Sequence, residues 1–160
     1  MKGEKRSADA KEDLPLSKAT QLLMEECRMI LPGIQALFGF QLIAVFNARF
    51  SEVLSPAEQR LHLCAIGLIV VAVALIMSPA AYHRQTGPDQ VTEQLVRIST
   101  RLVLWSMPPL AVSLCAEFYL IARVITDRTV ASILAAFLLA VFLLLWFVLP
   151  RVRRLQGTLG

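Results

Sequence analysis

The chain has 160 residues, of which 56% are hydrophobic and 18% charged, and 16 lysines and arginines against 12 acidic residues give a net charge of +4. Soluble domains are about 45 to 50% apolar and about one quarter charged, and this chain has a mean hydropathy of +0.61. The composition excludes a large soluble catalytic domain and predicts a protein of the lipid bilayer.

Four apolar runs are each long enough to cross the bilayer core, which takes about 20 helical residues. They comprise residues 29–48, 61–82, 102–122 and 129–150. The runs are continuous, which argues against the short alternating strands of a membrane barrel. We therefore predict an all-α polytopic membrane protein, a bundle of four transmembrane helices. This domain covers residues 17–154, between a disordered cytoplasmic tail at 1–16 and a C-terminal tail at 155–160. The first span is expected to be an uncleaved signal anchor.

The basic residues predict the orientation of the bundle. With four spans both termini lie on one side, and the opposite side holds only Arg49, Arg60, Arg123 and Arg128 of the 16 basic residues. The positive-inside rule therefore predicts that both termini lie inside, in the cytoplasmic (inner) membrane. The positive charge also favours anionic lipid contacts, whereas no basic domain with interleaved aromatic residues supports nucleic-acid binding.

The loop between the first two spans contains a helix start. Ser55, Pro56 and Glu58 have the spacing of an N-cap, an N1 proline and an N3 acid, so we expect the second helix to begin there. The loop at residues 123–128 is short, which predicts an antiparallel hairpin of spans three and four.

The middle loop is expected to lead into an amphipathic helix on the cytoplasmic side. Apolar residues recur at Val91, Leu95, Ile98 and Leu102. Another face carries Arg97, Arg101 and Trp105, the pattern of a helix that crosses the headgroup layer. With His83 and Arg84 at the inner end of span two, these arginines form the predicted cytoplasmic interface. Its expected role is lipid anchoring, and effector binding or gating is the alternative.

Polar residues inside the spans are the candidates for function. Glu117 is the only carboxylate within a span; such a residue costs about 2.5 to 3.5 kcal/mol to insert and raises a functional hypothesis. Its alternatives are a structural hydrogen bond or snorkelling to the interface. His62 in span two lies at a similar depth and is a possible partner for Glu117. The alternative is an interfacial histidine at the end of the span.

Span one carries three amides, Gln35, Gln41 and Asn47, each six residues from the next. Six residues turn a helix by about 600°, so the amides point in three directions and leave no purely apolar face. We expect span one to be surrounded by protein or to line a wet cavity, which favours a homo-oligomer. Interhelical hydrogen bonding alone is the alternative.

Two further features concern spans three and four. Pro108 and Pro109 withhold backbone donors from the carbonyls of Leu104 and Trp105, which, with Glu117, form a possible cation or water site. Plain helix kinks without a ligand are the alternative. In span four a stripe of small residues predicts close helix packing, and Trp146 and Arg151 anchor the cytoplasmic end. The stripe consists of Ser132, Ala136 and Ala140.

The sequence lacks the usual signals for enzymatic chemistry and for a metal site. The sequence has no catalytic triad pattern and no phosphate-binding glycine loop. Its three cysteines, Cys27, Cys64 and Cys115, are too far apart for a metal-ligand pair and are expected to be free thiols. We therefore expect no enzyme activity, no metal and no cofactor.

Several short motifs resemble an uncharacterised family of small four-helix bacterial membrane proteins, over roughly residues 22–154. The matching residues are Glu26, Arg28, Gly33, Gln35, Phe38, Phe40, Phe50, Gln59, Pro79, His83 and Arg84. Some members of the family are labelled sodium:proton antiporter, and the resemblance then implies roles for Gln35, His83 and Arg84. Glu117 is not part of the motif, so the resemblance adds nothing to a proton role for it.

The leading functional hypothesis is transport. A homo-oligomer would conduct or exchange monovalent cations or protons along span one, with Gln35 and Gln41 on the route and Glu117 carrying protons. The alternative is a structural or regulatory membrane protein whose polar residues only stabilise helix packing. Four helices without an internal repeat are few for a complete antiporter, an objection that an oligomer would meet.

Overall fold

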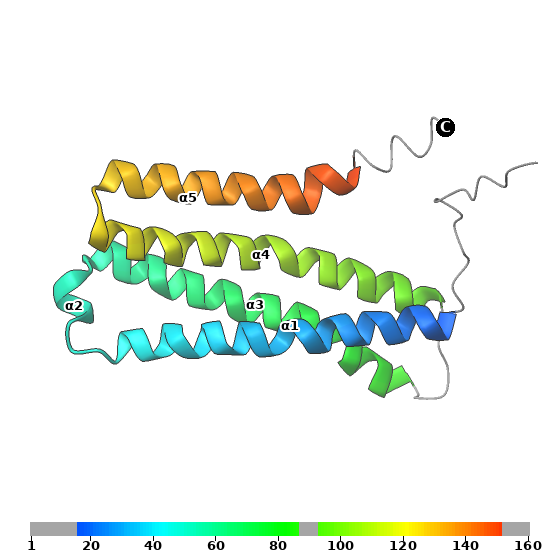
Figure 1. The fold of residues 1–160 in the computed structure, drawn as a ribbon. Coiled ribbons are helices and arrows are strands. Elements are labelled where there is room, and N and C mark those ends of the chain that lie inside the picture. The colour runs from blue at the N-terminus through cyan, green and yellow to red at the C-terminus, as the bar shows by residue number, and fades with distance from the viewer. Residues whose placement is uncertain (1–15, 87–92, 152–160) are drawn as a thin grey trace, which may run out of the picture.

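The computed structural model describes residues 16–86 and 93–151, and the secondary structure of this part is helical (Figure 1). The predicted tails at 1–16 and 155–160 fall outside it, except for residue 16. The elements are α1 (Leu16–Val45), α2 (Phe50–Val53), α3 (Pro56–Thr86), α4 (Glu93–Ile125), α5 (Arg128–Leu143) and the π-helical turn η1 (Leu144–Val148).

Four of these helical segments are long and apolar enough to cross a membrane, as predicted. They cover Lys18–Val45, Pro56–Tyr82, Glu93–Ile125 and Arg128–Arg151. All four run beyond at least one bound of the predicted span, because the polar residues that flank the apolar runs continue the same helices. The four helices indicate a multi-pass membrane protein.

One predicted boundary is wrong. Span one was expected to reach Ala48, but α1 ends at Val45. The side-chain oxygen Oδ1 of Asn47 accepts a hydrogen bond from the backbone N–H of Arg49 at 3.0 Å. Asparagine favours such local turns over helix, so the chain leaves α1 early and enters the short helix α2.

The predicted start of the second membrane helix is confirmed. α3 begins at Pro56, and Glu58 Oε2 accepts hydrogen bonds from the backbone N–H of Ser55 at 2.9 Å and from its hydroxyl at 2.7 Å. The N–H of Glu58 lies 3.4 Å from Ser55 Oγ, which completes a capping box.

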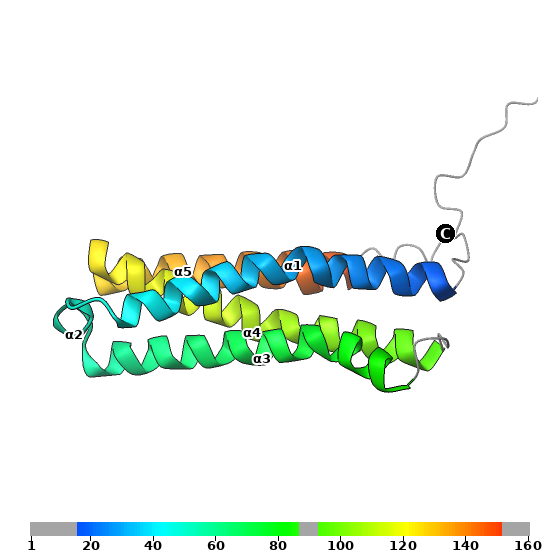
Figure 2. The same cartoon turned by 90° about the horizontal axis from the view of Figure 1, so that it is seen from below.

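The long helices lie side by side, with α3 and α4 in the most extensive contact (Figures 1 and 2). α5 packs against α4, whereas α1 packs against α3 and α4. We call the end that holds α2 and the turn between α4 and α5 the α2 end. The opposite end, where α1 and α4 begin and η1 lies, is the terminal end.

Buried residues follow a seven-residue repeat on α1, α3 and α4, and on α4 it falls at Ser99, Ser106, Ser113 and Leu120. On α3 they recur at alternating steps of three and four, at His62, Ala65, Ile69, Ala72, Ile76 and Pro79. On α1 the repeat is sparser, one residue in seven, at Thr20, Cys27, Ile34 and Gln41. Such a period is typical of helices that wind around each other with a left-handed supercoil.

Small residues allow α3 and α4 to approach closely. Ala65 and Ala72 on α3 are both 0% exposed. The buried hydroxyl of Ser113 on α4 donates a hydrogen bond to the backbone carbonyl of Ala65 at 2.8 Å. Beside this contact Ile69 packs in the main apolar core with Cys27 and Val103.

The expectation that span one is surrounded is not met within a single chain. Of its three amides only Gln41 is buried, whereas Gln35 and Asn47 are exposed. The reason is that α1 touches α3 and α4 along a single line of residues. Most of its surface therefore faces outward.

The predicted packing stripe on span four is likewise not buried within a single chain. Ser132, Ala136 and Ala140 are exposed, and the buried residue of α5 is Ala131, which is 0% exposed. α5 packs mainly against α4, so it buries only one face, and that face begins one residue earlier.

The predicted amphipathic start of span three is confirmed for the described residues. Leu95 is buried and Leu102 half-buried, whereas Arg97, Arg101 and Trp105 are exposed. Val91 lies outside the described residues, so the register of the stripe rests on the later positions.

Candidate functional site

An ionisable pair links α3 to α4 near the α2 end. His62 Nδ1 lies 2.9 Å from Oε1 and 3.0 Å from Oε2 of Glu117. His62 is 3% exposed, and the Glu117 side chain is 18% exposed. His62 occupies a position of the buried repeat of α3, which is why its ring points toward α4. The two residues that the sequence offered as possible partners are therefore in contact.

The other ring nitrogen of His62 contacts a third helix. His62 Nε2 lies 3.1 Å from the backbone carbonyl oxygen of Gln41 on α1. A carbonyl oxygen only accepts hydrogen bonds, so this contact requires the proton on Nε2. Nδ1 then faces the carboxylate, and one further proton lies either on Nδ1 or on a Glu117 oxygen. The arrangement can hold a proton that moves over a single short contact between histidine and glutamate.

An open pocket with a volume of about 400 Å³ gives access to this pair. Its walls include His62 and Glu117, together with Asn47, Arg49 and Phe50 from the segment after α1. The Phe50 ring lies over the imidazole, with ring centroids 5.3 Å apart and an angle of 58° between the planes. The chain between α1 and α3 thus forms part of the wall, and the pair is reachable from the α2 end.

Among the described residues, Gln41 has a side-chain hydrogen-bond acceptor without a partner, in addition to its backbone contact with His62. In the described part of the chain, its buried amide oxygen Oε1 has no hydrogen-bond partner. A buried polar group without a partner costs about 1 to 3 kcal/mol. Gln41 therefore combines a backbone contact to His62 with a side-chain acceptor that a proton donor or a cation could use.

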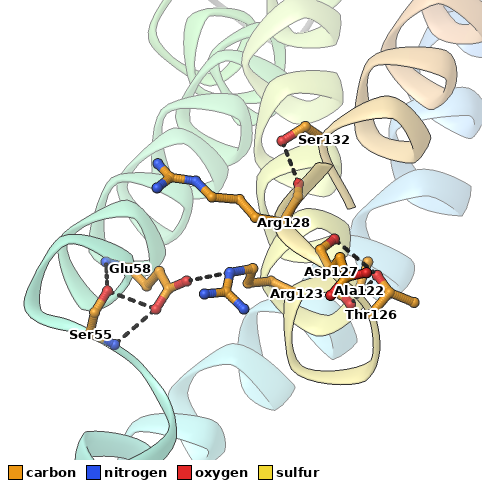
Figure 3. A network of polar contacts seen from close by, with 8 residues as sticks. All are labelled: Ser55, Glu58, Ala122, Arg123, Thr126, Asp127, Arg128 and Ser132. Carbon is orange, nitrogen blue, oxygen red and sulfur yellow. Dashed lines mark hydrogen bonds and ion pairs between the residues drawn. The ribbon is translucent and has the colours of Figure 1, made fainter. Parts of the chain in front are cut away.

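A second ion pair lies beside the pocket, at the outer edge of α3 and α4 (Figure 3). Arg123 Nε lies 3.5 Å from Oε1 of Glu58, the same glutamate that caps α3. A smaller cavity of about 210 Å³ is lined by this pair and by Val53, Leu54 and Val124, which also line the larger pocket. Charged side chains therefore flank the approach to His62 and Glu117.

The structure brings together some of the predicted site residues and separates others. Gln41, His62 and Glu117 meet, and Asn47 lies on the pocket wall. Gln35 is exposed on α1 and takes no part in this site. Among the predicted interface residues at the other end of the bundle, Arg84, Arg97 and Arg101 are exposed, and the side chain of His83 lies outside the described residues.

Two contributors to the site were not predicted as site residues. Arg49 and Phe50 line the pocket, and Phe50 covers the imidazole. The available signal was an aromatic residue next to an arginine in a short loop between two spans, which is also typical of plain interfacial anchoring.

The predicted cation site at the proline carbonyls is wrong. Leu104 and Trp105 line a pocket with Pro108 and Trp146 toward the terminal end, and this pocket shares no lining residue with the one at Glu117. Trp105 and Glu117 are twelve residues apart on α4, which corresponds to roughly 18 Å along a helix. That separation is too large for shared coordination.

Within residues 16–86 and 93–151, no group of three His, Cys, Asp or Glu side chains could hold a metal ion. The three cysteines are free, with Cys27 and Cys115 buried and Cys64 exposed.

Fold and site together define a helical multi-pass membrane protein with a histidine–glutamate pair between its helices. The chain belongs to the Family of unknown function (DUF6328), whose family model matches residues 12–150. This agrees with the resemblance to an uncharacterised family. Neither the curated proteins nor the solved structures gave a significant match.

Proposed function

We propose that the protein, as a homo-oligomer in the cytoplasmic membrane, carries protons or exchanges them for a monovalent cation, with His62 and Glu117 as the proton-holding site. One observation carries the proposal: an ionisable pair lies within membrane-length helices and faces a pocket that opens at one end. Ionisable residues at such positions are rare and typically mark ion or proton pathways.

The pocket gives the pair access from the α2 end. By the positive-inside rule the α2 end is the outer face. A proton from that side reaches Glu117 through the pocket and passes to Nδ1 of His62. Toward the terminal end the buried positions of α3 become apolar, at Ala65, Ile69 and Ala72. On α4 buried hydroxyls continue in that direction at Ser113, Ser106 and Ser99. Those of Ser113 and Ser106 donate to backbone carbonyls, which favours alternating exchange at the pair over an open pore.

Proton flux into liposomes tests this function. Reconstituted wild-type protein is expected to dissipate an imposed pH gradient, read from an enclosed pH-sensitive dye. The variants Glu117→Gln and Gln41→Leu should lower the rate to that of protein-free liposomes, because one removes the proton carrier and the other the nearby amide. Replacing internal potassium with sodium or choline would reveal a coupled cation.

The matched control for this assay is Glu52→Gln. Glu52 is an exposed carboxylate on α2 at the same end of the bundle, so its removal should leave the flux unchanged. Absence of flux in the wild type, or flux that is indifferent to Glu117→Gln and Gln41→Leu, would reject transport. Either result would favour a role limited to helix packing or regulation.

The proposal of a homo-oligomer is based on the outward face of α1. Gln35 is exposed there, and two turns farther along the same face lies the apolar Leu42, which is 38% exposed. An amide that faces hydrocarbon lacks partners, whereas the α1 of a second copy could supply them. A wall formed by two copies of α1 would also extend the route from Gln41 to Gln35.

Oligomeric state can be tested independently of flux. We expect light scattering in detergent to give a particle of two or more chains. In a chain whose three native cysteines are changed to alanine, Gln35→Cys should form an intermolecular disulfide. Val70→Cys on α3, where Val70 is 50% exposed, should not. A monomeric particle without cross-linking at position 35 would rule out the oligomer.

A further inference from the structure

A second pocket lies toward the terminal end, between α4 and the end of α5. Its volume is about 420 Å³, and its walls include Trp105, Pro108, Trp146, Phe147 and Arg151. Binding pockets for small molecules usually measure about 300 to 1,000 Å³. The proposed transport mechanism does not use this pocket, which shares no lining residue with the one at His62.

Helix irregularities on both walls shape this pocket. On α4, Pro108 has no N–H to donate to the carbonyl of Leu104, and both residues line the pocket. On the facing wall the chain makes the π-helical turn η1, Leu144–Val148, with Trp146 at its centre. π-Helical turns are rare and are frequently found at functional sites. The Trp146 ring also contacts Phe142, with centroids 4.7 Å apart, which helps to fix its position.

Positive charge lies on the wall of the pocket and on the turns of α4 that precede it. Arg151 is exposed and forms part of its wall. Arg101 and Arg97 are exposed one and two turns before Trp105 on the same face of α4. Glu93 begins that face and lies one turn farther away than Arg97, so the nearest charges are basic. The aromatic residues and prolines of the wall match the apolar chain of a ligand. The arginines toward the terminal end match an anionic head group on the same ligand.

We propose that this pocket is a binding site for one anionic phospholipid. An acyl chain lies between Trp105 and Trp146, and the phosphate group is held by Arg151 and Arg101. The proposal is independent of transport, since it concerns a different pocket and a different ligand.

The sequence provides its own probe for this site, because its two tryptophans both line the pocket. Bromine atoms on an acyl chain quench tryptophan fluorescence at short range. We would reconstitute the protein into vesicles of phosphatidylcholine that contain an increasing fraction of brominated phosphatidylglycerol, or of brominated phosphatidylcholine. Quenching by the anionic lipid should reach half of its maximum at about a fivefold lower mole fraction. That factor corresponds to about 1 kcal/mol for a basic side chain at the anionic headgroup.

Variants test whether this pocket causes the preference for the anionic lipid over phosphatidylcholine. Arg151→Gln should abolish most of it, whereas Arg60→Gln should retain it, because Arg60 is exposed at the α2 end and its Nε donates to the Pro56 carbonyl. Trp105→Phe and Trp146→Phe each leave one tryptophan, and both single-tryptophan proteins should show the preference. Equal quenching by the two lipids would overturn the site. So would a preference that survives Arg151→Gln and Arg101→Gln.

Discussion

Replacing both His62 and Glu117 with leucine is expected to leave the free energy of unfolding within about 1.5 kcal/mol of the wild type, while abolishing proton flux. Either single replacement should cost more, about 3 to 5 kcal/mol, because it leaves one buried polar partner without the other. The allowance of about 1.5 kcal/mol reflects the loss of the hydrogen bond from His62 Nε2 to the Gln41 carbonyl, 3.1 Å long. Reversible unfolding in mixed micelles would measure the four proteins as a double-mutant cycle.

The cycle separates the two hypotheses for the pair. A proton carrier has no need to stabilise the fold, so an apolar replacement of both residues is tolerated. If the double variant instead loses as much stability as either single variant, the pair is a structural link between α3 and α4. Losses that simply add up would mean that the two side chains do not stabilise each other. The pair of Glu58 and Arg123 provides the control. It spans 3.5 Å with side chains that are 16% and 41% exposed, so its coupling energy should be only about 0 to 1 kcal/mol.

The substitution Ala72→Leu is expected to lower the free energy of unfolding by about 1 to 3 kcal/mol. Ala72 is 0% exposed in the contact of α3 with its neighbours, and a larger side chain there forces the helices apart. Thermal unfolding in detergent would register the loss as a lower midpoint temperature.

A matched control lies two residues farther along α3. Ala74 is exposed, so Ala74→Leu adds the same atoms on the outward side and should change the midpoint little. Equal effects of the two substitutions would show that α3 and α4 do not pack through the Ala72 face. The predicted role of close α3–α4 contact would then be wrong.

The sequence was sufficient to predict the membrane-length helices, because long apolar runs and the Ser55–Glu58 cap are local signals. It was also sufficient to select Gln41, His62 and Glu117, since polar residues stand out in apolar spans. The contact among these three residues was harder to predict than their identity. It depends on which face each helix presents, and the amides of span one point in three directions. The side of α5 that packs was missed for the same reason, because Ala131 and Ser132 are both small.

The end of α1 at Val45 was not predicted for a different reason. Apolar residues continue to Ala48, so composition alone extends the span, whereas the side chain of Asn47 stabilises a turn. Such local competition depends on geometry that hydropathy does not record. The proline carbonyls and Glu117 likewise shared a helix in the sequence, but distance along the helix axis separates them.

The one-in-seven repeat of buried residues on α1 has a mechanical consequence. Thr20, Cys27, Ile34 and Gln41 lie along one line, so a quarter-turn of α1 about its own axis would disengage all four together. Rotation of α1 about its axis would therefore change the contacts at both of its ends at once. Thr20 and Gln41 are about 30 Å apart along the axis, yet a twist imposed at Thr20 would move the Gln41 carbonyl away from His62 Nε2. The buried line thus makes the contact between the Gln41 carbonyl and His62 Nε2 sensitive to any rotation of α1.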